Sequence, residues 1–309
     1  MLKDCQSGGR FEGTVLITEW KETPFRQKPG SFLLFTCQDV SGMMSGKIWD
    51  PKPDHLFWLK EHDVYRISAK VTEFKGTLDL TVDDLTPVDE QDVDWTALLP
   101  SSPYSAEELE ARLQNLLSRI KLPQWQAFLN CILAPEELGT AFRQAPAAMR
   151  MHQPYLRGLW EHSVLVAEMA QSIGTFYPEM DEELLIIGAL LHDIGKIHEY
   201  SYGRGIAVTS EGRLLGHIVM GVDLLGKYIA AIPDFPADLR MKFLHIIASH
   251  HGRYEWQSPK RPKSREALLV HYVDALEADL WQFYQTGQEN PDQEWSPYVR
   301  SLERYLLLK

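Results

Sequence analysis

The chain has 309 residues, of which 44% are hydrophobic and 24% charged, so it can bury a large core and exceeds the usual length of a single domain. Two domains are therefore expected. The formal net charge of −12 argues against a broad, sequence-blind grip on duplex nucleic acid, whereas a narrow path for a single strand needs only a few basic and aromatic side chains.

Short runs with alternating apolar residues between residues 11 and 88 predict β-strands. These runs cover residues 11–18, 31–36, 45–49, 63–71 and 76–82. Turn residues such as Gly42 and Pro51 separate them, which favours a small closed barrel. The sequence therefore predicts an all-β domain over residues 1–90, and an oligonucleotide-binding (OB) fold is the simplest barrel of this size.

Two segments of this domain resemble motifs of nucleic-acid-binding OB domains. The segment from Asp39 to Trp49 resembles their D-x-[ST]-G…W motif, and the segment from Phe74 to Leu80 resembles their Y-x-G-x-L-x-L motif. If the domain binds a single strand, its aromatic residues can stack on bases and its lysines can contact phosphates. The candidates are Phe35, Lys47, Trp49, Phe74 and Lys75. The alternative is that these aromatic rings fill the barrel core, and the domain carries more acidic than basic residues.

Residues 91–145 are expected to form a linker and connecting helices, and residues 146–309 an all-α domain. The linker is acidic and then rich in proline and serine, after which Ser105 and Glu108 can cap a helix that runs to about Ile120. From there to the C-terminus, apolar residues recur at helical spacing. The expected helices cover residues 125–133, 161–173, 182–191, 214–229, 237–249 and 265–284.

Histidines and aspartates in these expected helices are spaced as metal ligands are. The set consists of His162, His192, Asp193, His217, His250, His251 and Asp274. The pair His192-Asp193 ends the apolar run 184–191 and would be costly to bury without a partner such as a metal ion. Imidazole and carboxylate together suit Mn, Fe or Zn.

We expect two divalent ions. One ligand shell is His162, His192, Asp193 and Asp274, and the second is His217 with one of His250 and His251. Asp193 can bridge the two ions, and the order of the residues leaves open which histidine of the doublet binds. Two such ions would activate water for attack on a phosphodiester, so Asp193 is the expected catalytic residue. Lys196 either balances charge on the phosphoryl oxygens as a second catalytic residue or is a surface cation.

Four other histidines are interpreted as structural or surface residues, because a lone histidine on an apolar face is more often one of these than a ligand. They are His152, His198, His245 and His271.

The ligand pattern around His192-Asp193 resembles the HD-domain superfamily of metal-dependent phosphohydrolases. Further motifs in the chain are Arg157-Gly-Leu-Trp-Glu-His162, Glu211-Gly-Arg-Leu-Leu-Gly-His217, Ser249-His-His-Gly252, Ser258-Pro-Lys-Arg-Pro262 and His271-Tyr-Val-Asp274. Together with the expected OB domain in front, they resemble one branch of this superfamily, the YhaM-type 3′→5′ exoribonucleases. The resemblance implies removal of nucleotides from the 3′ end of single-stranded RNA, and of single-stranded DNA as a second substrate. It also implies Mn as the favoured ion, with Fe, Mg, Ni, Co or Zn as alternatives, and a homo-oligomer.

Two other functions stay open. The chain could be a phosphohydrolase of small nucleotides or cyclic dinucleotides that uses the barrel as an interaction module. It could also be a non-catalytic nucleic-acid-binding protein that keeps metal for structure. The basic residues Arg253, Lys260 and Arg261 either line the entrance for a nucleic-acid substrate or belong to a solvated loop.

The remaining signals concern the cellular compartment. No stretch approaches the roughly 18 uninterrupted apolar residues of a membrane span, and the N-terminus lacks the basic-then-apolar pattern of a secretory signal. We therefore expect a cytoplasmic protein with no membrane partner. Cys5, Cys37 and Cys131 are far apart and in no CxxC spacing, so they are expected to be buried or incidental thiols.

Overall fold

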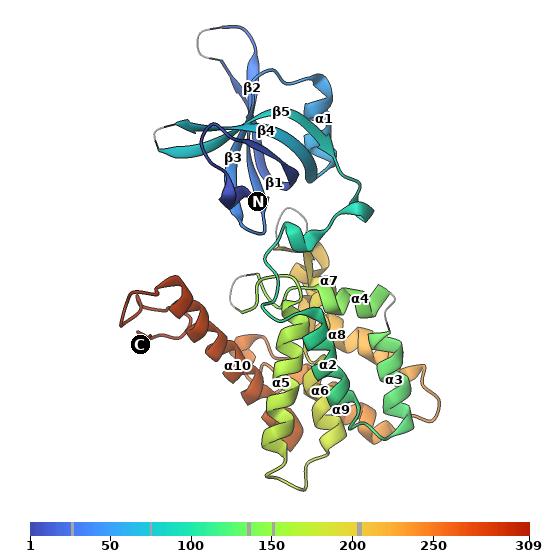
Figure 1. Cartoon of the computed structure of the whole chain (residues 1–309). Coiled ribbons are helices and arrows are strands. Elements are labelled where there is room, and N and C mark those ends of the chain that lie inside the picture. The colour runs from blue at the N-terminus through green and yellow to red at the C-terminus, as the bar shows by residue number, and fades with distance from the viewer. Residues whose placement is uncertain (26–27, 75, 135–136, 150–151, 203–205) are drawn as a thin grey trace. The chain divides into compact units, whose positions relative to one another are not determined.

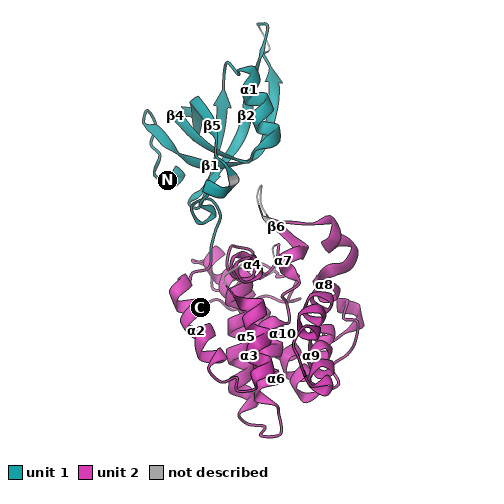
Figure 2. Cartoon of the chain, turned by 90° about the vertical axis from the view of Figure 1, so that its right-hand side faces the viewer, with its two compact units in different colours: residues 1–101, 202–205 teal, residues 102–201, 206–309 magenta. Residues whose placement is uncertain are grey.

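The structure is a computed structural model that describes residues 1–309 except 26–27, 75, 135–136, 150–151 and 203–205 (Figure 1). The chain folds into two compact units (Figure 2). Of the described residues, the first contains 1–101 and Tyr202, and the second contains 102–201 and 206–309.

A closed barrel makes up most of the first unit. Its strands are β1 (Arg10–Pro24), β2 (Ser31–Asp39), β3 (Gly42–Ile48), β4 (Val64–Phe74) and β5 (Thr77–Pro87). They follow the order β1-β2-β3-β5-β4 around the barrel, β3 and β5 pair in parallel, and the other neighbours are antiparallel. This OB-like barrel confirms the fold predicted for the N-terminal part.

Helical segments flank the strands. Helix α1 (Pro53–Glu61) joins β3 to β4, where the sequence predicts only turn residues. Pro53 suits the first turn of a helix, and Leu59 anchors α1 in the barrel core with 1% of its surface exposed. Single turns of 3₁₀-helix are η1 (Leu2–Asp4), η2 (Glu90–Asp92) and η3 (Trp95–Ala97).

The barrel core explains the position of Phe35. The alternate residues Leu33, Phe35 and Cys37 of β2 lie in the interior of the barrel, and each is at most 2% exposed. A Cβ atom at Gly46 would lie 2.4 Å from the Phe35 ring, so the glycine makes room for it. The prediction that Phe35 stacks on a base is wrong, because its ring fills the barrel. Burial also raises the pKa of the Cys37 thiol to about 12. Cys5, Cys37 and Cys131 are all free.

The second unit is helical. Its helices are α2 (Ala106–Leu117), α3 (Pro123–Leu133), α4 (Glu137–Gln144), α5 (Gly158–Gly174), α6 (Glu182–Leu191), α7 (Lys196–Glu199), α8 (Ser210–Ala230), α9 (Ala237–Ser249), η4 (Tyr254–Trp256) and α10 (Arg265–Glu289). A small two-stranded sheet of β6 (Tyr200–Tyr202) and β7 (Ile206–Val208) lies between α7 and α8, where the sequence predicts no strand. Among the described residues, no helix combines the length and apolar character that a membrane span needs.

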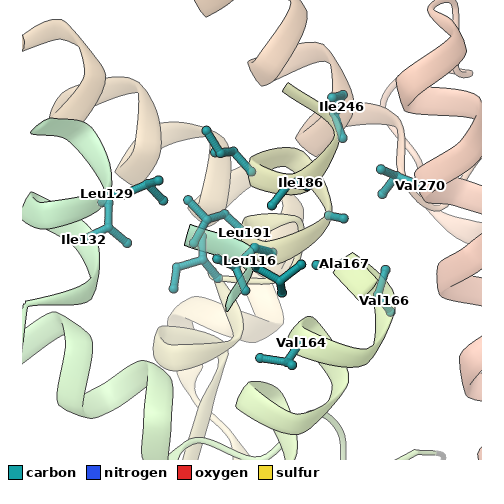
Figure 3. Close-up of a cluster of buried hydrophobic side chains, with 14 of the residues drawn as sticks. Leu116, Leu129, Ile132, Val164, Val166, Ala167, Ile186, Leu191, Ile246 and Val270 are labelled. Atoms are coloured by element: carbon teal, nitrogen blue, oxygen red, sulfur yellow. The ribbon is translucent and has the colours of Figure 1, made fainter. Parts of the chain in front are cut away.

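The helices share one hydrophobic core (Figure 3). Leu116 of α2 and Ile132 of α3 lie in it together with Val164 of α5, Ile186 of α6 and Ile246 of α9. The helices α2 and α3 are therefore packed parts of the helical unit. The predicted start of α2 is confirmed, since Ser105 and Glu108 form a reciprocal capping box.

Candidate metal centre

Helix α6 carries His192 and Asp193 into the interior of the helical unit. Asp181 caps the helix by accepting a hydrogen bond from the backbone N–H of Leu184 at 3.0 Å. Every residue from Leu184 to Leu191 is buried, so the helix packs on neighbours all round. His192 and Asp193 follow with 0% and 2% of their surfaces exposed. A carboxylate at this depth needs compensating partners.

Four residues surround this helix end and form the first ligand group. They are His162 of α5, His192, Asp193 and Asp274 of α10, and one ligand atom from each lies within 4.8 Å of the others. The Nε2 atom of His162 lies 3.2 Å from Oδ1 of Asp274 and 3.2 Å from Nε2 of His192. Three separate helices thus converge on one point, as the sequence predicts for these residues.

The second ligand group consists of His217, His250 and His251, whose ligand atoms also lie within 4.8 Å of one another. His217 follows a kink in α8 at Gly216, where φ is 70° and ψ is 155°. A positive φ favours glycine, and the kink separates His217 from the preceding turn of the helix. The doublet ends α9, and the structure brings both of its histidines to this group.

Asp193 lies between the two groups. Its Oδ2 atom is 3.3 Å from Nε2 of His192 and 3.5 Å from Nε2 of His162. Its Oδ1 atom is 3.3 Å from Nε2 of His217 and 3.4 Å from Nε2 of His250. One carboxylate therefore presents a different oxygen to each group, which is the arrangement of a bridging ligand.

The five histidines are oriented alike, because each places Nδ1 against a hydrogen-bond acceptor. The acceptors are Glu277 Oε2 for His162 at 2.6 Å, Ala189 O for His192 at 2.7 Å, Glu199 Oε2 for His217 at 2.9 Å, Ile247 O for His250 at 2.8 Å and Trp256 O for His251 at 2.7 Å. The carbonyl oxygens, and the carboxylate oxygens of Glu277 and Glu199, accept these hydrogen bonds, so Nδ1 carries the proton. In the neutral ring Nε2 then offers a lone pair towards the centre.

Several polar atoms at this centre need a cation. Among the described residues, Asp193 Oδ1, His217 Nε2 and His250 Nε2 are buried without a hydrogen-bond partner. In addition, the Nε2 atoms of His162 and His192 face each other at 3.2 Å, although Nδ1 is the donor in both rings. A divalent ion in each group would satisfy these donor atoms, so the residues fit two metal ions.

The electrostatics favour positive charge at the same place. Burial works against ionisation of Asp193, but Lys196 and His192 outweigh it and hold the pKa of Asp193 well below its usual range. Burial likewise opposes protonation of His192, yet Asp193 and Asp274 raise its pKa to about 9. The first group thus attracts a proton when no metal is bound, and a divalent ion has to displace that proton.

Two glutamates, which the sequence does not mark as site residues, hydrogen-bond to the histidine ligands on the side away from the centre. Glu277 accepts from His162 Nδ1 and also from Gln153 Nε2 at 2.6 Å. Glu199 accepts from His217 through both Nδ1 and the backbone N–H. Glu277 comes three residues after Asp274, on the same face of α10, and this spacing is the one signal that could have revealed it.

Lys196 and His152 lie beside the first group. Lys196 is only 4% exposed and donates to Asp193 Oδ2 at 2.6 Å and to His152 Nε2 at 3.2 Å. The alternative that Lys196 is a surface cation is therefore wrong. The His152 ring lies 5.2 Å from that of His162, so it belongs to the surroundings of the site. Burial, followed by Lys196, lowers the pKa of His152 well below its usual value.

The residues predicted to bind nucleic acid are placed unevenly. Trp49 is 49% exposed, whereas Lys47 pairs with Asp79 at 2.6 Å. Lys75 lies outside the described residues, as does the side chain of Phe74. Arg253, Lys260 and Arg261 are all exposed on the loop that follows the second ligand group.

Gly195 allows the turn after Asp193 to touch α8. A Cβ atom at this position would lie 2.0 Å from the carbonyl oxygen of His217 and 2.7 Å from the backbone nitrogen of Gly221. We expect Gly195→Ala to push these segments apart and to lower the free energy of unfolding by about 1–3 kcal/mol or more. Urea unfolding followed by circular dichroism measures this loss.

Gly226→Ala is the matched control in α8, because the described residues place no atom within 4 Å of its added Cβ. It should raise stability by up to about 1 kcal/mol, since alanine is the better helix former. Equal stability of the two variants would contradict the close contact at Gly195.

Comparison with known proteins finds a family match within the helical unit. Residues 159–279 match the family model of the HD domain, and this span contains both ligand groups. The HD domain of the phosphodiesterase PgpH from L. monocytogenes is a similar solved structure, with 17% sequence identity and a TM-score of 0.30 over 52% of this chain and 74% of that chain. The match to the HD domain supports metal-dependent phosphohydrolase activity and the binding of divalent ions by this unit.

Proposed function

We propose that the protein is a metal-dependent 3′→5′ exonuclease that hydrolyses the phosphodiester bonds of single-stranded RNA and also of single-stranded DNA. The observation that carries the proposal is the position of Asp193, whose two oxygens face two separate groups of histidines. Phosphodiester cleavage by two metals uses such a shared carboxylate. The direction of degradation rests on the resemblance to YhaM-type enzymes.

When bound, the divalent ions supply Lewis-acid polarisation of the scissile phosphate and lower the pKa of water towards neutrality. Asp193 and Asp274 contribute the negative charge that holds such ions, and Lys196 provides a cation next to them. Glu277 and Glu199 keep the rings of His162 and His217 in orientation. This chemistry needs no protein nucleophile. Mn is the proposed ion, because mixed imidazole and carboxylate ligands suit it.

A group of aromatic side chains on the barrel supports the proposal that the substrate is single-stranded. Trp49 stacks on Phe25 with ring centroids 6.2 Å apart and contacts Phe32 at 4.9 Å. The ammonium group of Lys28 lies 4.1 Å from the centre of the Phe25 ring. Trp49 is exposed, while Phe25 and Phe32 are half-buried beside it. Accessible aromatic rings next to a cation are the elements with which proteins bind unpaired bases and their phosphates.

A time course with labelled RNA tests the proposal. The substrate is a 5′-labelled single strand of about 30 nucleotides, longer than the roughly 4–16 nucleotides that one OB fold covers. With Mn, we expect a ladder that shortens from the 3′ end. Excess EDTA should abolish the reaction and added Mn should restore it, because hydrolysis depends on ions bound at the two ligand groups.

Other outcomes would redirect the assignment. Intact RNA together with metal-dependent hydrolysis of a small nucleotide or cyclic dinucleotide would replace the exonuclease by a small-molecule phosphohydrolase. Tight binding of the strand without turnover under Mn, Mg, Fe or Ni would indicate a non-catalytic binding protein.

A further inference from the structure

The loop that follows the second ligand group exposes two large aromatic side chains. Tyr254 and Trp256 of η4 are 58% and 49% exposed. Neighbouring exposed aromatic side chains, unlike apolar residues scattered singly over a surface, are typical of ligand-binding sites.

The loop is held in place by internal hydrogen bonds. The backbone N–H groups of Trp256 and Ser258 both donate to the carbonyl oxygen of Arg253, at 3.1 Å each, and that of Lys260 donates to Ala248 at 3.1 Å. Gly252 has a φ of 73°, and an added Cβ would meet the His271 ring at 2.3 Å, so the loop begins at a tight contact with α10. Rigid aromatic rings lose little entropy when they bind a ligand.

Each aromatic ring has a guanidinium group over it. Arg253 lies 4.7 Å from the centre of the Trp256 ring, and Arg261 lies 5.0 Å from that of Tyr254. Lys260, Lys263 and Arg265 add to the positive charge of this loop, and Glu255 opposes it. A ligand that matches this surface has flat rings and negative charges, as a polynucleotide has.

The loop is tied directly to the metal centre. The carbonyl oxygen of Trp256 accepts the hydrogen bond from Nδ1 of His251, a member of the second ligand group, at 2.7 Å. The Trp256 ring also lies 6.0 Å from that of His271, which donates from Nδ1 to the carbonyl oxygen of His250 at 2.7 Å. A base stacked on Trp256 would therefore belong to a nucleotide close to the scissile phosphate.

We propose that Tyr254 and Trp256 form a stacking subsite for the unpaired bases at the 3′ end of the strand, with Arg253 and Arg261 against the adjacent phosphates. The inference rests on the proposed exonuclease function and assigns the recognition of the strand end to this loop. The subsite reads the faces of the bases, so it accepts all sequences and excludes paired ends.

The test compares two 5′-labelled single strands that differ only at the 3′ end, where one carries two abasic nucleotides. Fluorescence anisotropy in EDTA measures binding without cleavage. We expect Trp256→Ala to raise the Kd for the intact strand between about fivefold and about a hundredfold. Its Kd for the abasic strand should equal that of the wild type. Trp256→Phe should retain most of the affinity, and Tyr254→Ala should behave as Trp256→Ala does.

Trp295→Ala is the matched control, since Trp295 is 55% exposed in the C-terminal segment and should not affect either Kd. The inference is overturned if Trp256→Ala binds the intact strand as the wild type does, if it weakens both strands equally, or if the wild type binds neither. Cleavage with Mn is scored separately. A wild type that distinguishes the strands but degrades neither would overturn the exonuclease and keep the subsite.

Discussion

Replacing Asp193 by asparagine should reduce phosphodiesterase activity by more than about a thousandfold. A residue that only supports a ligand from behind already contributes about 10–100-fold to metal affinity or activity, and Asp193 faces both ligand groups. The amide of asparagine keeps the size of the side chain but removes its charge. Steady-state hydrolysis of the labelled RNA at saturating Mn measures the effect.

Asp223→Asn is the control for this variant. Asp223 lies on α8, is 64% exposed and pairs with Lys227 at 2.6 Å, so its charge is screened by water and far less consequential. It should retain full activity. Wild-type turnover by a folded Asp193→Asn protein would remove Asp193 from the reaction.

Replacing Glu277 by glutamine should raise the Mn concentration needed for half-maximal activity by about 10–100-fold. The carboxylate of Glu277 accepts from His162 Nδ1 at 2.6 Å, and glutamine can still accept there through its oxygen. The His162 ring can therefore keep its orientation, while the new amide group faces the Gln153 Nε2 donor. Loss of the neighbouring charge makes Nε2 of His162 a weaker metal ligand. Activity measured as a function of Mn concentration separates this change from a lower maximal rate.

Glu289→Gln provides the comparison on the same helix, because Glu289 is exposed and hydrogen-bonds only Gln285 among the contacts described. It should leave the Mn dependence unchanged. If Glu277→Gln lowers the maximal rate at an unchanged Mn requirement, Glu277 supports the substrate or the packing instead of a metal ligand.

The residues of the ligand groups could be predicted from the sequence because their chemistry is distinctive. Histidines and aspartates at the ends of apolar helices have few stable roles other than metal binding. The sequence could not show which oxygen of Asp193 faces which group, or that both histidines of the doublet lie in the second group, since these depend on the packing of α5, α8, α9 and α10.

The supporting residues were harder to find. Glu277 and Glu199 look like ordinary surface glutamates of helices until the fold places His162 and His217 next to them. His152 follows the same rule, because only the folded chain brings it to Lys196. Apart from the three-residue spacing of Glu277 from Asp274, these side chains carry no local signal in the sequence.

In the barrel, the alternation of apolar residues does not always predict which face of a strand is buried. In β2 apolar residues occupy both alternating faces, so Phe32 and Phe35 are equally good candidates for the interior. A shift of one residue in the strand register would move every side chain of the strand to the opposite face of the sheet. The structure buries Phe35 and places Phe32 against Trp49 at the surface. The strands β6 and β7 are too short for an alternation of apolar and polar residues to be recognised in the sequence.

Electron paramagnetic resonance of the Mn-loaded protein shows directly whether one carboxylate serves both ligand groups. We expect two Mn ions per chain with a magnetically coupled spectrum, because the two oxygens of Asp193 face the two ligand groups. Asp193→Asn should abolish the coupling. A single ion per chain at saturation, or two ions with the separate hyperfine patterns of isolated Mn, would contradict the shared carboxylate.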